Sequence, residues 1–271
     1  MTEDPVEKFM YEMIERYKTL AREELKLRWD AWSLEMGEVE KHEVIAALLA
    51  RQVTLATQLA SNPGIWNGHI APLILRSMVD NYINLAWIFM DPQERSKKFI
   101  EYGLGQQKLM IEHRKKELEK KGVKDPEKTP EINGLEAWVN SQRYTFLTTV
   151  SVGSWADRDT RKMAEEADCL DLYRYAYTPF SSSVHSQWDH ISRYNLETCS
   201  NPLHRYHKVP IDFELPPDPD YFYRSAKYVE KAFKLFDDKL NIQVDIQSAF
   251  ERLNSDLEAL GHMAVAHHKK G

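Results

Sequence analysis

The chain has 271 residues, 42% of them hydrophobic, with a formal net charge of −6 and a sequence pI near 6.0. This length can bury one full core, and the negative charge argues against a dedicated nucleic-acid coat or a binder of anionic membranes. The two cysteines, Cys169 and Cys199, lack the spacing of a paired metal or redox site, which favours a reducing cytoplasm. The N-terminus lacks the apolar run of a secretory signal, and no apolar stretch is long enough to span a bilayer. We therefore expect a cytoplasmic protein without a membrane partner.

Two amphipathic helices are predicted first, over residues 5 to about 35 and about 38 to 60. Their apolar residues recur mainly at three- and four-residue steps, and the second run stops at Ser61-Asn-Pro-Gly64. The first half of the first run is highly charged outside its apolar stripe. We expect this helix to pack loosely or to serve an oligomer partner.

The third predicted helix, about residues 66–90, is the most apolar and is expected at the centre of the fold. It carries Arg76 and Asp80, which share a face because they are four residues apart. Buried charges are costly unless they are paired. Arg76 is therefore either paired structurally with Asp80 or aimed at an anion in a cleft.

The fourth predicted helix begins at Asp91-Pro92-Gln-Glu94, which supplies an N-cap acid, an initial proline and a glutamate at the third position. It is predicted to end at Gly122, and its basic end alternates with acids, which favours a solvated helix end over a nucleic-acid patch. A polar loop, a short helix through Phe146 and helices over 158–167 and 170–177 follow.

After Asn195 the chain is predicted to be irregular, with a short extended piece near 207–213 and helices from about 220 and over 244–260. We predict an all-α fold, a multi-helix bundle with a long proline-containing surface loop. Four parts are expected, and they are an N-terminal amphipathic helix (1–35), a core bundle (36–197), the loop (198–219) and C-terminal helices packed on the core (220–271).

Residues 173–190 are the strongest candidate for a functional site, because polar and titratable groups crowd there between residues expected to be buried. Pro179 is predicted to end one helix, with Ser181 or Ser182 as the N-cap of the next. His185 then lies in a first turn, where the helix dipole favours the neutral imidazole that a general base requires. Asp189 shares its face and is placed to orient the ring, whereas His190 and Trp188 point elsewhere.

A structural interpretation of the same segment stays open. In that interpretation Ser181 caps a helix, His185 bonds a carbonyl group in the core, and Asp189 pairs with an arginine. The sequence holds no Gly-rich phosphate loop, no Gly-x-Ser-x-Gly elbow and no His-Glu-x-x-His helix. Plausible metal ligands are His185 with Asp189, His204 with His207, and Cys199 nearby, but their spacing matches no familiar pattern. We therefore expect neither a metal nor a cofactor.

A combination of segments resembles an uncharacterised bacterial family, domain of unknown function 5677, over about residues 45–195. The segments are Leu75-Arg76-Ser-Met-Val-Asp80, Asn84-Leu-Ala-Trp-Ile, Asp91-Pro-Gln-Glu-Arg95, Phe99-Ile-Glu-Tyr102, Tyr173, Tyr177, Ser181-Ser182 and Val184-His185. The family is helical and is more distantly similar to the HEPN group of helical bundles. Many HEPN proteins are metal-independent ribonucleases of toxin and phage-defence systems, and they often join their sites across a two-fold axis.

The resemblance implies a homo-oligomeric ribonuclease that acts on RNA. His185 would take a proton from the ribose hydroxyl, Arg76 or Arg174 would stabilise the phosphate charge, and Asp80 or Asp189 would orient these groups. The supporting residues would be Tyr177, Ser181 and Ser182. The HEPN hallmark is an arginine shortly before a histidine, and Arg174 is too far from His185 to match it.

The competing hypothesis is a non-catalytic helical interaction or regulatory module with a protein partner. Geometry separates the two hypotheses. Convergence of Arg76, Asp80 and His185 on an accessible cleft would favour catalysis, and burial of these residues within the bundle would favour the module.

Overall fold

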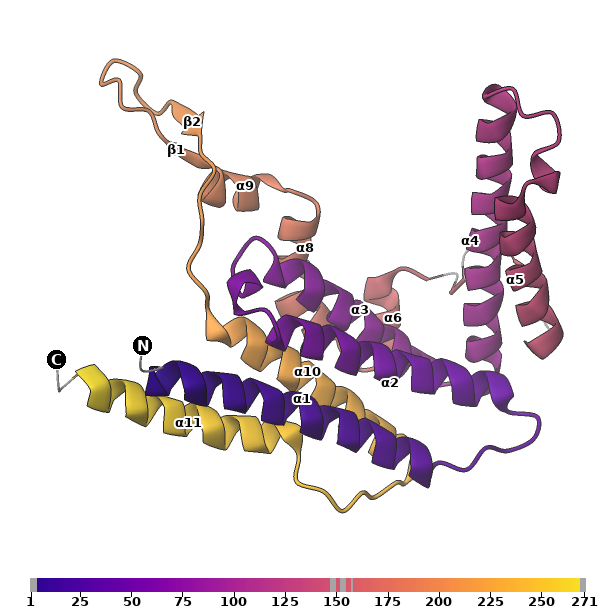
Figure 1. The fold of residues 1–271 in the computed structure, drawn as a ribbon, viewed down its shortest axis with the longest axis horizontal. Helices are drawn as coiled ribbons and strands as arrows, with labels where there is room; N and C mark the ends of the chain where they lie inside the picture. Colours follow the sequence, from indigo (N-terminus) through magenta and orange to yellow (C-terminus); the bar gives the residue numbers. More distant parts are fainter. Residues whose placement is uncertain (1–3, 147–149, 152–154, 157, 269–271) are drawn as a thin grey trace.

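The computed structural model describes residues 4–146, 150–151, 155–156 and 158–268. Over these residues the chain forms helices apart from one antiparallel hairpin, which confirms the predicted all-α bundle (Figure 1). The elements are α1 (Pro5–Ala31), α2 (Val39–Ala60), η1 (Pro63–Ile65), α3 (Ala71–Ile88), α4 (Pro92–Lys120), η2 (Pro126–Lys128), α5 (Pro130–Phe146), α6 (Thr160–Glu166), α7 (Leu170–Leu172), η3 (Tyr173–Tyr177), α8 (Thr178–Val184), α9 (Trp188–Tyr194), β1 (Leu196–Thr198), β2 (Lys208–Pro210), α10 (Pro219–Leu240) and α11 (Ala249–His268).

The main core lies where α3 packs against α2 and α10 on one side and against α6, η3 and α8 on the other. The third helix is thus central, as predicted, but it begins at Ala71 and not near Trp66. Trp66 lies before it and is buried, because its indole donates to the carbonyl oxygen of Leu59 (2.7 Å) and stacks on Phe222 of α10.

A buried polar network joins the three central helices. The side chain of Asn81 in α3 donates to Leu48 O and to Oε1 of Gln52, both in α2 and both at 2.8 Å. The amide of Gln52 in turn donates to the carbonyl oxygens of Met78 and Tyr228, each at 3.3 Å. Buried polar groups satisfied in this way fix the register of α2, α3 and α10.

Helix α1 does not pack loosely, because α11 runs beside it and α2 lies on its other flank (Figure 1). Arg16 of α1 pairs with Asp256 of α11 at 2.9 Å. The last helix begins at Ala249 and not at residue 244, because the hydroxyl of Ser248 caps it by accepting bonds from the amides of Phe250 and Glu251.

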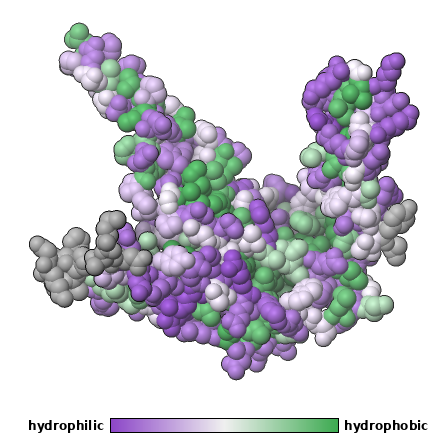
Figure 2. All heavy atoms as spheres, viewed as in Figure 1, coloured by the Kyte–Doolittle hydropathy of each residue, from purple (hydrophilic) through white to green (hydrophobic). Residues whose placement is uncertain are grey.

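Two arms project from the bundle (Figure 1). The α4–α5 arm has a small core of its own, made of Leu104, Ile111, Ile132 and Val139. The second arm carries α9 and the hairpin, in which Leu196 faces Pro210 and Thr198 faces Lys208. The extended piece predicted in the loop is therefore one strand of a pair. Figure 2 shows hydrophobic residues gathered at the feet of the arms, while the α4–α5 arm is mostly hydrophilic outside.

None of the helices that the structure describes combines the length and the apolar character needed to cross a lipid bilayer.

Candidate functional site

Arg76 lies in the middle of α3 and faces η3 and α8, with only 8% of its surface exposed. Its Nε donates to the hydroxyl oxygen of Ser181 (2.9 Å), and its Nη1 pairs with a carboxylate oxygen of Asp80. Its guanidinium carbon lies 3.1 Å from the centre of the Tyr177 ring. The structure thus forms the predicted Arg76–Asp80 pair and brings two predicted supporting residues, Tyr177 and Ser181, to the same guanidinium.

The partners of Arg76 are themselves held in place. The Ser181 hydroxyl donates to the carbonyl oxygen of Tyr177 (2.7 Å), and the Tyr177 ring stacks on Tyr173 with centroids 4.5 Å apart. Burial raises the pKa of Asp80, and the positive charge of Arg76 opposes this rise. The cluster joins α3 to α8, and groups within the chain neutralise most of the positive charge of the Arg76 guanidinium.

The predicted helix break at Pro179 is wrong. Thr178 has helical backbone angles, and the helix continues from α7 through η3 into α8. Residues 173–177 form a π-helical turn in which the Thr178 amide donates to Tyr173 O, and Pro179 follows this turn inside the continuous helix. Neither Ser181 nor Ser182 is an N-cap, since both lie inside α8.

His185 is the C-cap of α8 and does not lie in a first turn. The predicted place of His185 at the N-terminal end of a helix dipole is therefore wrong. The helix ends there because Ser186 adopts a left-handed conformation (φ 48°) and the Gln187 amide donates to Ser182 O. The His185 side chain is exposed and makes no hydrogen bond or ion pair within the described part of the chain.

Arg174 also lies apart from the Arg76 cluster. Its side chain is exposed and reaches Asp171 on its own helix at 3.9 Å. Asp189 is exposed in the first turn of α9. The structure therefore assembles Arg76, Asp80, Tyr177 and Ser181, but it brings neither His185 nor Arg174 to them.

A cavity of about 220 Å³, here the α8–α9 cavity, lies between α8, α9 and the start of α3. Its lining includes two of the predicted residues, Ser182 and Asp189, together with Ser183, His190 and Arg193. Ser183 Oγ lies 3.0 Å from Nδ1 of His190. Burial lowers the pKa of His190, and the neighbouring ring of His69 lowers it further, so that the imidazole is neutral near pH 7.

No pattern in the sequence singles out His190. The helical spacing placed Asp189, and not His190, beside His185. The turn at Ser186 breaks that spacing and directs His190 back to Ser183. His69 precedes α3 and lies 6.1 Å from His190, centroid to centroid, a contact between residues far apart in the chain.

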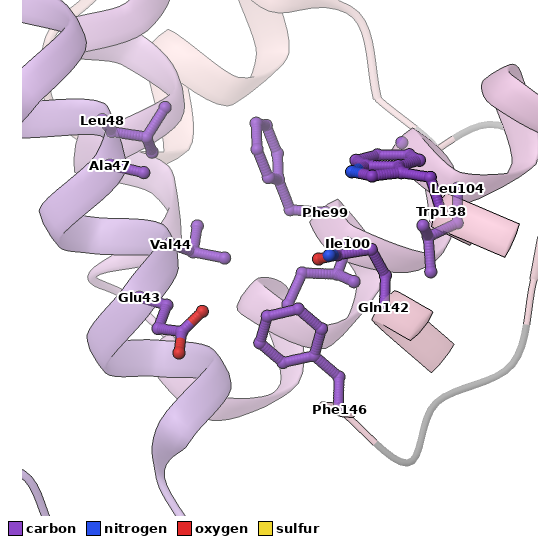
Figure 3. Close-up of a pocket in the computed structure, with 11 residues that line it drawn as sticks. Glu43, Val44, Ala47, Leu48, Phe99, Ile100, Leu104, Trp138, Gln142 and Phe146 are labelled. Atoms are coloured by element: carbon purple, nitrogen blue, oxygen red, sulfur yellow. The ribbon is translucent and has the colours of Figure 1, made fainter. Parts of the chain in front are cut away.

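A larger hollow, here the α2–α4–α5 pocket, lies where the foot of the α4–α5 arm meets α2, with a volume of about 320 Å³ (Figure 3). Its walls are mostly apolar, and half of the Trp138 surface is exposed beside it. The lining residues named in Figure 3 are Val44, Ala47 and Leu48 from α2, Phe99, Ile100 and Leu104 from α4, Trp138, Gln142 and Phe146 from α5, and Glu43. No signal in the sequence pairs α5 with α2.

The fold and these sites define an α-helical bundle with two projecting arms and two hollows at their feet. Residues 42–201, more than half of the chain, match the family of unknown function (DUF5677), and the chain belongs to this family. The match runs from α2 into the hairpin and leaves α1, α10 and α11 outside it. No curated protein and no solved structure matches the chain.

Proposed function

We propose that this chain is a non-catalytic interaction module that holds an apolar side chain of a protein partner in the α2–α4–α5 pocket. The observation that carries the proposal is the pocket itself. Its volume of about 320 Å³ lies at the low end of the range of small-ligand sites, and its walls are apolar with few polar groups. Aromatic residues with partly exposed faces, such as Trp138, often anchor protein interfaces.

A negative charge beside the pocket indicates which partner residues would fit there. Glu43 lies on the α2 wall of the pocket and supplies a negative charge beside the apolar lining (Figure 3). An apolar residue followed by a lysine or arginine would therefore fit better than one followed by an acid.

The contacts of Arg76 also support a non-catalytic module. Its guanidinium is buried against Tyr177 and bonded to Asp80 and Ser181, so that binding a phosphate there would require these contacts to be broken. The exposed His185 is not one of its neighbours. Arg76 and Asp80 thus serve the packing of the bundle, and Arg76, Asp80 and His185 do not converge on a cleft as the catalytic hypothesis requires.

Gly103 offers a test. It lines the pocket in α4, and a Cβ atom added there meets no atom within 4 Å, so that we expect Gly103→Phe to extend into the hollow without disturbing the helix. Gly134 in α5 is equally open but does not line the pocket, which makes Gly134→Phe the matched control. We expect the apolar dye anilinonaphthalene sulfonate to bind the wild type and Gly134→Phe, and to bind Gly103→Phe at least about tenfold more weakly.

The same pair of variants tests the protein partner. A partner captured by the wild type and by Gly134→Phe, but not by Gly103→Phe, uses the pocket. If Gly103→Phe captures the same proteins and binds the dye as well as the control does, the pocket is not the binding site and the proposal is abandoned.

A second candidate function is a metal-independent ribonuclease of a bacterial toxin or phage-defence system, HEPN-like, homodimeric and cytoplasmic. The contact between Ser183 and His190 in the α8–α9 cavity favours it, because a neutral imidazole beside a polar cavity has the state that a general base needs. Arg193 lines the same cavity and is suited to offset phosphate charge.

Incubation with total RNA, followed by sequencing of the cleaved ends, separates the two functions. Cleavage that His190→Ala abolishes, while the exposed His113→Ala on α4 retains it, would establish the ribonuclease in place of the module. Light scattering on the same samples tests the homodimer, and a monomer at micromolar concentration would contradict it. No cleavage by any of these proteins would leave the module as the better account.

A further inference from the structure

The tip of the β1–β2 hairpin gathers three side chains of the kinds that bind transition metals. One ligand atom each from Cys199, His204 and His207 lies within 4.8 Å of the other two. The Sγ of Cys199 and the Nδ1 of His204 are 3.7 Å apart, and the centroids of the two imidazole rings are 5.5 Å apart. None of the three lines the α8–α9 cavity or the α2–α4–α5 pocket.

The backbone of the turn builds this cluster. The Cys199 amide donates to His207 O (3.0 Å), which closes the loop across the strands. Two further turn bonds follow, from the His204 amide to Asn201 O and from the His207 amide to His204 O. Tyr206 takes a left-handed conformation (φ 64°) just before the second histidine. The turn therefore brings Cys199, His204 and His207 close together, although their spacing in the sequence does not indicate a metal site.

The distance between Cys199 and His204 is close to that of a tetrahedral metal centre. With Zn–S near 2.3 Å and Zn–N near 2.0–2.1 Å, the ligand atoms of a tetrahedral zinc site lie about 3.3–3.6 Å from one another. The observed separation of 3.7 Å between Sγ and Nδ1 is close to that value. One thiolate and two imidazoles are a donor set that suits zinc better than magnesium or calcium, which prefer oxygen ligands.

We propose that Cys199, His204 and His207 bind a zinc ion at the hairpin tip, with the fourth coordination position open to water or to a group of a partner. This site goes beyond the proposed function and does not depend on it.

The surroundings give the ion a structural role. The sheet has two short strands, and residues 200–208 are exposed, so that no apolar core lies beneath the tip. An isolated two-stranded hairpin is marginally stable in water, and a metal that binds only the ordered form stabilises that form.

The experiment uses the full chain without an affinity tag, freed of metal by a chelator. Zinc chloride is titrated by calorimetry, and cobalt chloride by absorption, because cobalt bound to a thiolate gives a charge-transfer band. We expect about one ion per chain and a thiolate band. Each of Cys199→Ser, His204→Ala and His207→Ala should weaken zinc binding by roughly 100-fold or more and leave the helical melt unchanged.

Two control substitutions test whether zinc binds to histidines outside the proposed site. His113→Ala on α4 and the double substitution of His267 and His268 near the C-terminus should bind zinc as the wild type does. Hydrogen exchange should show that zinc slows exchange over residues 196–210 in the wild type but not in Cys199→Ser. Zinc affinity unaffected by the three ligand substitutions, a cobalt spectrum without a thiolate band, or binding lost only with His267 and His268 would each overturn the proposal.

Discussion

At the scale of single residues, the Arg76 guanidinium joins partners from α3, η3 and α8. Replacing it with alanine removes the bond to Ser181 and the contact with the Tyr177 ring, and leaves Asp80 without its cation. Since 40% of the Asp80 side chain is exposed, water limits the cost of the stranded charge. We expect Arg76→Ala to lower the free energy of unfolding by about 2–4 kcal/mol in urea denaturation.

Two companion variants make this expectation specific. Arg76→Lys keeps a charge near Asp80 but lacks the guanidinium fork, so that its loss should be intermediate. His185→Ala removes an exposed ring and should change the free energy of unfolding by no more than about 0.5 kcal/mol. A loss at Arg76→Ala as small as that at His185→Ala would show that the cluster does not stabilise the bundle.

The buried carboxyl group of Glu24 makes the stability of the folded chain depend on pH. It is buried in α1 beside Arg28, and burial raises the pKa of its carboxyl group to about 7. The ordinary value is 4.5, so that between about pH 4.5 and 7 the folded state binds more protons at this site than the unfolded state does. The contribution of Glu24 to stability therefore falls as the pH rises through this window, by about 1–3 kcal/mol in all.

The comparison with Glu24→Gln isolates this effect. The substitution keeps an oxygen that accepts a bond from the Ala249 amide but removes the titrating group. In thermal melts from pH 5 to pH 8, we expect the melting temperature of the wild type to fall relative to that of Glu24→Gln. Parallel curves for the two proteins would show that Glu24 does not titrate in this range.

At the scale of elements, the α4–α5 arm has a core separate from that of the bundle. Ile132 is fully buried in it, against residues such as Leu104 and Val139. We expect Ile132→Ala to cost about 2–4 kcal/mol locally, and hydrogen exchange to quicken in the outer part of α4 and in α5 but not in α3 or α10. Faster exchange throughout the chain would show that the arm and the bundle unfold as one unit.

The sequence predicted elements well where local signals agree. The Asp91-Pro92 start of α4 was correct because proline suits a first helical turn, even though the Asp91 side chain makes no capping bond. The same residue type misled at Pro179, where a π-helical turn fits the proline into a continuous helix. A propensity at one residue cannot reveal such a turn, in which Tyr177 packs against Arg76 of another helix.

Candidate sites were also predicted only in part, because local patterns predict contacts within one helix but not contacts that depend on turns. The Arg76–Asp80 pair follows from helical spacing within one element, and the structure contains it. The contacts of His190 with His69, and of Cys199 with His204, depend on turns at Ser186 and Tyr206 whose backbone angles are uncommon for such residues. Sequence periodicity carries no information about these turns.

At the scale of the whole molecule, the core crosses the boundary of the family match. Residues 42–201 hold α2 and α3, but the helix that packs against both is α10, which lies outside the match. Phe222, Val229 and Phe233 of α10 are 2% exposed or less, and the Gln52 side chain bonds Tyr228 O. The conclusion for this chain is that α10 is part of the core and does not merely cover it.

A fragment of residues 42–201 tests this view. Without α10 it exposes the faces of α2 and α3 that bury Phe222 and Phe233, and Trp66 loses its stack on Phe222. Large apolar faces without a partner favour a loosely packed state, so we expect broad thermal unfolding and strong binding of anilinonaphthalene sulfonate. A fragment of residues 39–243, which keeps α10, should unfold cooperatively. If residues 42–201 alone melted as sharply as the longer fragment and bound no dye, the family segment would be an autonomous domain and α10 an addition to its surface.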